Sequence, residues 1–282
     1  MVKLSDTFVI GGDLEVKRMG FGAMRLTGKG VWHWPKDLQA AEQVLQRAVE
    51  LGVQLVDTAD AYGPEVNEYL IAQTLHPYPE DLVVATKGGL TRGGPNNWER
   101  DGRPEHLKRA VRNSVRRLEV ERIDLYQLHA IDPDVPLEES LQALGEMQEQ
   151  GFIRHIGVSN FGVDELERAR EVVDVVCVQN RYNLAHRVHD PVVDYCEEEG
   201  IGFLPWYPLA VGELAEDDRL SSIAASHNAT ASQVALAWLL HRSPVILPIP
   251  GTSSVAHLEE NCGAAELELS DEDMAKLDEL KD

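Results

Sequence analysis

The strongest constraint on this chain is a repeated alternation of short apolar runs with longer amphipathic, charge-rich segments. Runs such as LVVAT at Leu82–Thr86 and VVCVQ at Val175–Gln179 are apolar at consecutive positions, which is typical of parallel strands buried on both faces. Between the runs, apolar residues recur at helical spacing, as at Leu141, Leu144 and Met147. The predicted strands are Met19–Met24, Gln54–Ala59, Leu82–Gly88, Ile123–His129, His155–Ser159, Val175–Gln179, Gly202–Trp206 and Val245–Ile249. The predicted helices include Leu38–Leu51, Glu65–Leu75, Pro104–Leu118, Leu137–Gln150, Val163–Val172, Pro191–Glu199 and Ala231–His241.

Eight strands that alternate with helices form either a closed barrel or a doubly wound sheet. A doubly wound dinucleotide fold should open with GxGxxG after its first strand, and the nearest stretch, GFGAM at Gly20–Met24, lacks that spacing. We therefore predict an α/β fold of the (β/α)8 TIM-barrel type, with residues 1–282 as a single domain, because such barrels of about 250 residues form one domain. The segments Thr7–Ile10 and Leu14–Arg18, joined by Gly11-Gly12-Asp13, predict an N-terminal β-hairpin that plugs the bottom of the barrel.

The chemistry of such a barrel takes place at the C-terminal ends of its strands, so the residues there are the candidate site. The second predicted strand leads to Asp57 and Tyr62, the third ends at Lys87, and the fourth ends at His129. Each residue alone has a simpler interpretation: a helix-capping aspartate, a loop aromatic, a solvated lysine or a core histidine. Together, at neighbouring strand ends, they would form a charged cluster that is costly to bury without a use.

This cluster has the composition of a proton donor for a carbonyl oxygen. A tyrosine has a pKa near ~10, and a neighbouring Lys87 ammonium favours the phenolate and is expected to lower the pKa of Tyr62. Asp57 would keep Lys87 charged and fixed in place, and His129 could hydrogen-bond the substrate oxygen. Proton donation by Tyr62, as a hydride reaches the carbonyl carbon, would be worth roughly 10²–10⁴ in rate.

Six stretches, in order and over nearly the whole chain, resemble those of the aldo-keto reductases. They are VDTADAYG at Val56–Gly63, ATKGG at Ala85–Gly89, LYQLH at Leu125–His129, IGVSNF at Ile156–Phe161, VCVQNRYN at Val176–Asn183 and ALAWLL at Ala235–Leu240. The resemblance implies a (β/α)8 barrel that reduces aldehydes or ketones to alcohols with a nicotinamide cofactor. It also implies a catalytic tetrad of Asp57, Tyr62, Lys87 and His129, in which Tyr62 is the general acid.

The resemblance further implies where the nicotinamide end of the cofactor binds. Ser159, Asn160 and Gln179 match the residues that hydrogen-bond the carboxamide in the family. In PWYPLA, the aromatic that stacks on the nicotinamide ring falls on Trp206, although core packing is a simpler interpretation of that residue. Two further residues of the same run are assigned to the cofactor, namely Tyr207 and Leu209.

The adenosine end departs from the family pattern. Many relatives hold the 2′-phosphate with a lysine and an arginine, and those places are taken here by Gly251 and His257. A helix expected to begin near Ser254 would offer its positive N-terminus to the phosphates. The other residues assigned to this end are Thr252, Ser253, Glu260 and Asn261. NADPH (NADP+) remains the expected cofactor, and NADH is the alternative.

The loops after the first and third predicted strands supply the expected substrate-binding residues. Met24, Trp32 and Trp98 would form an aromatic, apolar mouth, and loop anchoring is an equal alternative for the tryptophans. IPGTSSVAHLEEN at Ile249–Asn261, together with HIGVSN, VCVQNRYNLAHR and ALAWLLHRSP, resembles a bacterial subgroup that includes pyridoxal reductases (pyridoxine 4-dehydrogenases). Pyridoxal is therefore a candidate substrate. A general aldehyde reductase is an alternative of at least equal weight, because position 129 holds the ordinary histidine of the tetrad.

Two other function classes stay open at this point. Lys87 at a barrel strand end could form a Schiff base, as the nucleophile of an aldolase-like lyase does. That chemistry needs a lysine of lowered pKa, whereas Asp57 beside it would raise the pKa. The second alternative is a regulatory subunit that binds a nucleotide without turnover.

Composition narrows the expected partners and setting. With 26 basic and 48 acidic residues, the net charge of −22 repels nucleic acid and anionic lipid. Solubility is the simplest explanation of this charge, and adaptation to high salt is the alternative. No apolar run approaches the ~20 residues of a membrane helix, and the N-terminus lacks a secretory pattern. Because Cys177, Cys196 and Cys262 fit neither a disulfide framework nor a zinc site, we expect no metal and a cytoplasmic enzyme. The resemblance implies a small-molecule carbonyl substrate, and we expect a monomer or weak homo-oligomer.

Overall fold

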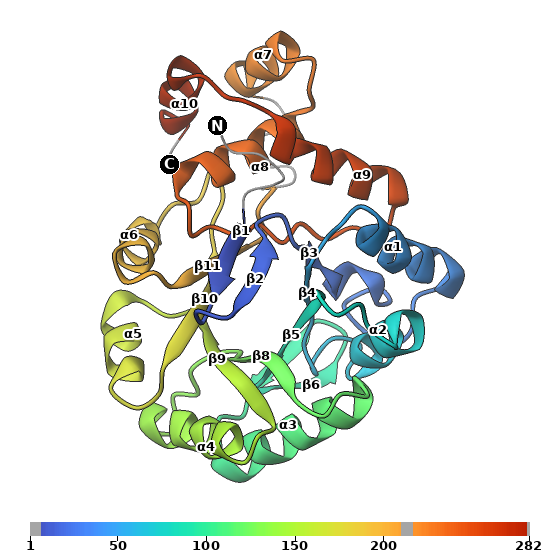
Figure 1. The fold of residues 1–282 in the computed structure, drawn as a ribbon, viewed down its shortest axis with the longest axis vertical. Coiled ribbons are helices and arrows are strands. Elements are labelled where there is room, and N and C mark those ends of the chain that lie inside the picture. The colour runs from blue at the N-terminus through green and yellow to red at the C-terminus, as the bar shows by residue number, and fades with distance from the viewer. Residues whose placement is uncertain (1–6, 210–216, 281–282) are drawn as a thin grey trace.

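A curled parallel sheet with helices packed around its outside forms the body of the computed structural model, which describes residues 7–209 and 217–280 (Figure 1). The strands follow the order β11-β10-β9-β8-β5-β4-β3 around the sheet. They are β3 (Phe21–Gly22), β4 (Leu55–Asp57), β5 (Val83–Gly88), β8 (Ile123–Leu128), β9 (Ile153–Ser159), β10 (Val175–Arg181) and β11 (Gly202–Trp206). The helices are α1 (Leu38–Glu50), α2 (Val66–Leu75), α3 (Pro104–Arg117), α4 (Leu137–Glu149), α5 (Val163–Arg170), α6 (Asp190–Glu199), α7 (Asp218–Ser226), α8 (Ala231–Arg242), α9 (Val255–Gly263) and α10 (Asp271–Asp278).

The segment 245–250 closes the sheet into a barrel, although it is not a regular strand. On one side it bonds β11, because the Phe203 amide donates to the Val245 carbonyl and the Leu247 amide donates to the Phe203 carbonyl, both at 2.8 Å. On the other side the Gly20 amide donates to the Pro248 carbonyl at 2.9 Å. The prolines at positions 248 and 250 have no N–H to donate, which explains why the predicted eighth strand pairs only in part. The predicted (β/α)8 barrel is confirmed.

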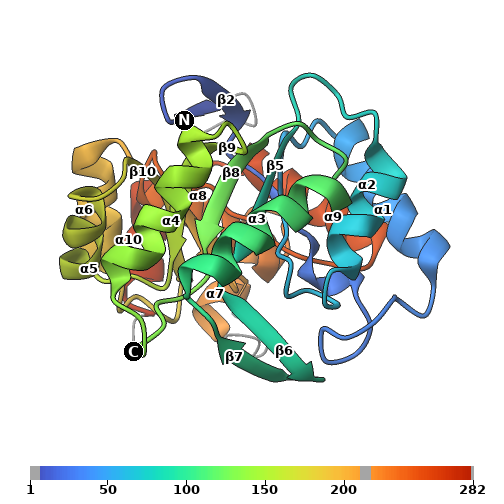
Figure 2. The same ribbon diagram turned by 90° about the horizontal axis from the view of Figure 1, so that it is seen from below.

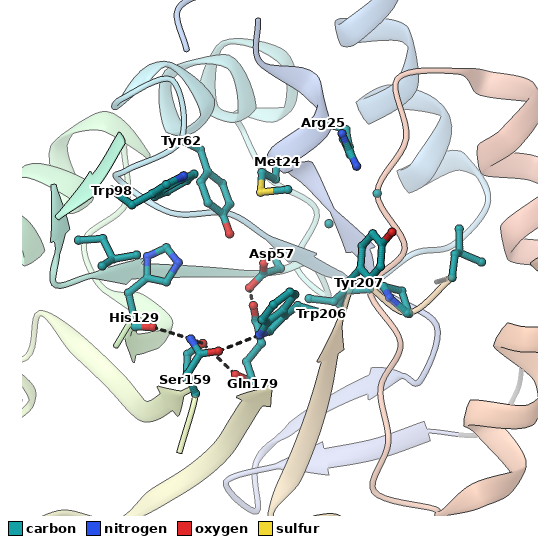
Figure 3. A pocket seen from close by; sticks show the side chains of 17 residues that line it. Met24, Arg25, Asp57, Tyr62, Trp98, His129, Ser159, Gln179, Trp206 and Tyr207 are labelled. Atoms are coloured by element: carbon teal, nitrogen blue, oxygen red, sulfur yellow. Dashed lines mark hydrogen bonds between the residues drawn. The ribbon is translucent and has the colours of Figure 1, made fainter. Parts of the chain in front are cut away.

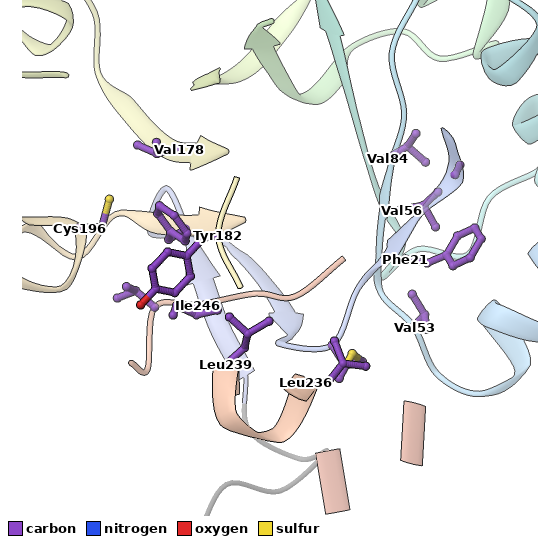
Figure 4. Close-up of a cluster of buried hydrophobic side chains, with 14 of the residues drawn as sticks. Phe21, Val53, Val56, Val84, Val178, Tyr182, Cys196, Leu236, Leu239 and Ile246 are labelled. Atoms are coloured by element: carbon purple, nitrogen blue, oxygen red, sulfur yellow. The ribbon is translucent and has the colours of Figure 1, made fainter. Parts of the chain in front are cut away.

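Apolar side chains between the sheet and the outer helices form the main core. Every residue of β4 and β5 is buried, as expected for strands covered on both faces. Leu236 and Leu239 of α8 face the barrel in the same cluster as Val56 of β4 and Ile246 (Figure 4). A capping box at Thr230 and Gln233 satisfies the first free amides of α8, which fixes where that helix begins.

The first barrel strand is shorter than predicted, since β3 covers only Phe21–Gly22 and the chain then turns into a 3-10 helix at Ala23–Leu26. The reason is a close approach to the segment that closes the barrel. A Cβ at Gly22 would lie 2.6 Å from the Ile249 carbonyl oxygen, and one at Gly251 would lie 2.6 Å from the Gly22 carbonyl oxygen. Both glycines are therefore needed there. The early turn carries Met24 and its neighbour Arg25 across the mouth of the barrel.

Two hairpins lie at opposite ends of the barrel (Figure 2). The predicted one, β1 (Thr7–Ile10) with β2 (Leu14–Lys17), buries Ile10, Leu14 and Val16 among the apolar side chains inside the barrel, so it plugs the bottom as expected. The second, β6 (Leu90–Gly94) with β7 (Asn97–Arg100), was not predicted and stands beside the C-terminal strand ends. In the two described ranges, no helix is long and apolar enough to cross a membrane.

Candidate active site

A cavity of about 460 Å³ opens at the C-terminal ends of the strands (Figure 3). This size is ordinary for a small-molecule site. Most of the residues predicted for the site line this one cavity. They are Met24, Asp57, Tyr62, Trp98, His129, Ser159, Asn160, Gln179, Trp206, Tyr207, Leu209 and Gly251. Lys87 lies behind the wall, fully buried.

Lys87 and Asp57 form a buried ion pair at the ends of two adjacent strands. The Lys87 ammonium donates to both oxygens of Asp57, at 2.8 and 2.6 Å, and to the Thr58 carbonyl at 2.8 Å. Burial lowers the pKa of Lys87, but the Asp57 carboxylate and the Tyr62 hydroxyl together raise it, and the net shift is upward. The ion pair holds the ammonium in place, and the upward shift favours its charged form.

Tyr62 lines the cavity beside this ion pair. The Lys87 ammonium is 5.2 Å from the centroid of the Tyr62 ring. Burial raises the pKa of Tyr62 and the Lys87 charge lowers it, and the net shift is upward. The expected lowering of this pKa is wrong for the protein alone, because taking the phenol out of water disfavours the phenolate by more than one ammonium favours it. Tyr62 is consequently held as a protonated phenol.

His129 faces Tyr62 across the cavity wall. The two rings meet edge to face, with centroids 5.8 Å apart and an interplanar angle of 78°. Burial, and then the Lys87 charge, lower the pKa of His129 well below its ordinary value, so the imidazole is neutral. Its Nδ1 atom is buried and finds no hydrogen-bond partner among the described residues. A neutral imidazole can donate a hydrogen bond to a substrate oxygen, but it is a poor source of a full proton.

Two glutamine side chains also donate hydrogen bonds to Asp57, and only one of them, Gln179, was predicted to belong to the site. Oδ1 of Asp57 accepts from Gln179 Nε2 at 2.8 Å and from Gln127 Nε2 at 3.1 Å. Gln179 Nε2 also lies 3.4 Å from Gln127 Oε1. The available signal for Gln127 was a polar residue in the middle of LYQLH, where a buried strand otherwise carries apolar groups.

The opposite wall is held together by Asn160. Its Nδ2 donates to the His129 carbonyl at 3.2 Å and to Ser159 Oγ at 3.0 Å, and its Oδ1 accepts from Trp206 Nε1 at 3.0 Å. Ser159 Oγ in turn donates to the Gln179 carbonyl at 2.8 Å. Asn160 has φ 65° and Tyr207 has φ 58°, a left-handed conformation that is uncommon for a bulky residue such as tyrosine. Trp206 keeps 37% of its surface exposed, which does not suit core packing.

The residues predicted for the adenosine end are placed outside this cavity, apart from Gly251. Thr252 and Asn261 are buried, whereas Ser253 and His257 are exposed. Ser254 caps α9 by accepting from the His257 amide at 3.4 Å, so the predicted helix start is confirmed. These further residues lie along the loop and helix that follow Gly251: Thr252, Ser253, His257, Glu260 and Asn261.

Arg25 lines the cavity and was not predicted to take part in the site. It is the only lysine or arginine among the described residues of the cavity wall, and it makes no hydrogen bond or ion pair with them. It is exposed, and its Cγ lies 3.5 Å from where a Cβ on Gly251 would stand. In a chain of net charge −22, a cation in this cavity that bonds none of the described residues points to an anionic ligand.

The two predicted substrate tryptophans differ in position. Trp98, on β7, lines the cavity and meets the rings of Tyr62 at 6.2 Å and His129 at 6.4 Å, edge to face in both cases. Trp32 does not reach the cavity wall and packs on His33 and on the Arg92 guanidinium. Loop anchoring therefore describes Trp32, and a direct substrate contact remains a prediction only for Trp98 and Met24.

Comparison with known proteins identifies relatives of this fold and site. The sequence model of the Aldo/keto reductase family matches residues 18–282. The chain is 51% identical over 269 residues to the uncharacterized oxidoreductase C215.11c of Schizosaccharomyces pombe, covering 95% of this chain and 88% of that one. It is 44% identical over 280 residues to pyridoxine 4-dehydrogenase of Escherichia coli, covering 97% and 98%. A solved aldo-keto reductase of Klebsiella pneumoniae in complex with NADPH superposes with a TM-score of 0.83 at 27% identity, covering 99% of this chain and 95% of that one.

Proposed function

The chain belongs to the aldo/keto reductase family, and from that premise we propose that it reduces aldehydes or ketones to alcohols with NADPH. One observation carries the proposal. The Tyr62 hydroxyl side of the cavity is backed by the Lys87–Asp57 ion pair, and the opposite wall presents the Trp206 ring and the Asn160 side chain. A carbonyl group laid between these walls would have a proton donor on one side and a flat ring platform on the other.

The residues present fit a dinucleotide cofactor. The half-exposed Trp206 ring offers a face for nicotinamide, and Ser159, Asn160 and Gln179 present hydroxyl and amide groups beside it. Gly22 and Gly251 also line the cavity, so that backbone groups as well as side chains face the bound ligand. Thr252, Ser253, His257, Glu260 and Asn261 remain the proposed contacts of the adenosine end, with NADH as the alternative cofactor.

Arg25 would hold the diphosphate of that cofactor. The diphosphate is the charged group closest to the nicotinamide, and Arg25 lines the same cavity as Tyr62 and Trp206. The adenosine-end residues lie farther along the chain and outside that cavity. Arg25 therefore supplies local positive charge that the −22 surface otherwise lacks.

In this mechanism, the bound reduced nicotinamide supplies the hydride to the carbonyl carbon. Tyr62 donates its phenolic proton to the carbonyl oxygen, which burial favours by keeping the phenol protonated. The Lys87 ammonium stabilises the phenolate left behind, and Asp57 keeps that ammonium charged. Neutral His129 orients the carbonyl oxygen by a hydrogen bond.

The geometry favours a reductase over a Schiff-base lyase. A lysine that attacks a carbonyl must be neutral and must reach the substrate. Lys87 is fully buried, does not line the cavity, and has a raised pKa because of Asp57. A borohydride trapping experiment with a carbonyl substrate should therefore leave Lys87 unmodified.

The proposed substrates are aromatic aldehydes, with pyridoxal among them. The support is the aromatic wall at Trp98 and the 44% identity to a relative named pyridoxine 4-dehydrogenase. A general aldehyde reductase fits the same cavity, because the apolar wall does not depend on one substrate functional group. We also propose a reducing compartment such as the cytoplasm, since Cys177, Cys196 and Cys262 are all buried and free.

The test is a panel of aldehydes and ketones, pyridoxal included, followed by cofactor absorbance with NADPH and with NADH. Wild type should oxidise NADPH with at least one aromatic aldehyde, and Tyr62→Phe should reduce turnover by roughly 10²–10⁴ while still binding cofactor. Turnover that survives Tyr62→Phe contradicts the assigned proton donor. Cofactor binding by wild type without turnover on any carbonyl would instead support the regulatory-subunit alternative.

A further inference from the structure

Arg92, on β6, has every guanidinium N–H bonded to a backbone carbonyl. An arginine carries five N–H donors in a planar fork, and here all five are used. Nη1 donates to Val31 at 2.9 Å and to Ala61 at 3.0 Å, and Nη2 donates to Gly30 at 2.9 Å. The remaining acceptors are the carbonyls of Asn97 at 3.0 Å and Gly94 at 3.3 Å.

These carbonyls belong to three segments that are distant in sequence and surround the mouth of the barrel. One is the loop 28–33, which follows the first barrel strand. The second is the turn at Ala61, one residue before Tyr62, and the third is the tip of the β6–β7 hairpin. A single side chain thus ties together the segments around the proton donor.

Arg92 also supports the aromatic wall. Its guanidinium carbon lies 3.6 Å from the centroid of the Trp98 ring, which is the distance of a stacked pair. The Trp98 ring in turn packs edge to face against Tyr62 and His129, and the ring centroids are 6.2 and 6.4 Å apart. Figure 3 shows Trp98 beside Tyr62 at the cavity. The orientation of Trp98 over these two residues therefore depends on the stack beneath it.

Backbone strain marks the loop that Arg92 holds. Val31 has φ 53° and His33 has φ 59°, both in the left-handed region. A β-branched residue such as valine rarely adopts this conformation, and it persists only when the surroundings fix it. The Val31 carbonyl accepts from Arg92 and also from the Gly63 amide at 3.3 Å, which links the strained loop to the residue after Tyr62.

We propose that Arg92 is a positioning residue that assembles the substrate wall, fixing the Trp98 ring at the cavity and so selecting aromatic aldehydes. The inference rests on the proposed carbonyl reduction. Arg92 acts on the substrate side more than on Tyr62 itself, because the turn of Tyr62 is fixed independently. The Tyr62 amide donates to the Ala59 carbonyl and the Asn67 amide donates to the Tyr62 carbonyl, each at 3.1 Å.

Three variants separate this role from general folding. Arg92→Met keeps much of the side-chain length but has no donor, and Arg92→Lys keeps the charge but has neither the fork nor the flat face. Arg100→Met is the matched control, because Arg100 lies on β7 of the same hairpin and its side chain makes no hydrogen bond or ion pair with the described residues. It changes the net charge by the same amount as Arg92→Met.

Kinetics with saturating NADPH give the first readout. For an aromatic aldehyde, kcat/KM should fall about tenfold in Arg92→Met and in Arg92→Lys, mainly through KM. For a short aliphatic aldehyde, which needs no flat wall, the change should stay within about threefold. Trp98→Leu should reproduce the loss of aromatic preference, and Arg100→Met should not. An unchanged ratio of aromatic to aliphatic efficiency in both Arg92 variants, or in Trp98→Leu, overturns the inference.

Hydrogen exchange of the cofactor-free chain gives a second readout that needs no activity. Amides of 28–33, and the Gly63 amide that donates to the Val31 carbonyl, should exchange faster in Arg92→Met than in Arg100→Met, because that loop loses its anchor. Faster exchange confined to the hairpin 90–100 overturns the positioning role, whatever the kinetics. A wild-type protein that reduces no carbonyl compound would reject the proposed function instead, and the exchange result would still decide whether Arg92 ties the three segments.

Discussion

The two halves of the proposed cofactor and substrate site are built in opposite ways. Around Asp57 the side chains bond one another, since its carboxylate accepts from Lys87, Gln127 and Gln179 within the barrel. Along Gly251–Asn261 the groups bond within their own loop or to the neighbouring start of α8. Thr252 accepts from the Ser254 amide at 3.1 Å, and Glu260 accepts from Thr230 Oγ1 at 2.6 Å near the surface.

This contrast separates two demands on the protein. Proton transfer needs groups fixed to within a fraction of an ångström, which strand ends linked by buried hydrogen bonds can provide. Binding the far end of a long cofactor tolerates looser contacts with water. Substitutions in the Asp57 cluster should therefore affect turnover and folding together, whereas substitutions along Gly251–Asn261 should change cofactor affinity and little else.

The largest expected effect is that of Asp57→Asn. It leaves the Lys87 ammonium buried without its counter-charge, and removing one partner of a buried ion pair costs about 3–5 kcal/mol. The matched substitution in the other half, Glu260→Gln, should change stability by less than ~0.5 kcal/mol. Urea unfolding of both variants at neutral pH measures the difference. Equal destabilisation by the two substitutions would remove the contrast.

Much of this architecture was readable from the sequence because it is local. The apolar runs gave the barrel strands, and Asp57, Lys87 and His129 could be placed at their ends because strand ends share one edge of the barrel. The pKa of Tyr62 could not be predicted, since its direction depends on how burial compares with one nearby charge. The kink after Gly22 was also missed, because it depends on a backbone contact with Ile249, far along the chain.

The residues that sequence reasoning missed act across long separations. Arg92 donates to backbone carbonyls in the loop at 30–31 and in the turn at Ala61, and no local pattern in the sequence of β6 predicts these partners. Gln127 was missed for the same reason, because its partner Asp57 lies 70 residues away in sequence. Arg25 directly follows the predicted end of the first strand, but only the fold shows that it faces a cavity and that its side chain pairs with none of the described residues.

A smaller effect is expected from Gln127→Leu, which sharpens the contrast inside the buried half. The variant removes one donor from the Asp57 carboxylate, and a hydrogen bond to a charged group is worth about 1.5–3 kcal/mol. We expect kcat for carbonyl reduction to fall about tenfold or more with KM for the aldehyde nearly unchanged. Thr252→Ala, in the outer half, is the comparison and should leave kcat unchanged. A pure KM effect in Gln127→Leu would contradict a positioning role.

Arg25→Gln should weaken cofactor binding by only about fivefold, because an exposed ion pair is worth at most ~1 kcal/mol. Since Arg25 is placed at the diphosphate, NADPH and NADH should weaken alike, as measured by tryptophan quenching on titration. Arg122→Gln is the control, because it removes the same charge far from the cavity. Arg122 directly precedes β8, at the N-terminal end of that strand, and makes no ion pair with the described residues. Weakening of NADPH alone would move Arg25 to the 2′-phosphate.

The smallest expected effect is that of pH on carbonyl reduction near neutrality. Burial raises the pKa of Tyr62, so the phenol stays protonated as the pH rises, and burial lowers the pKa of His129 well below its ordinary value, so the imidazole stays neutral as the pH falls. Lys87 stays charged because its pKa is raised. With saturating NADPH, kcat should therefore change by less than about twofold from about pH 6 to about pH 8. An inflection of kcat near the ordinary histidine pKa in wild type, absent in His129→Asn, would contradict this prediction. It would show that His129 titrates during turnover and is therefore in contact with water.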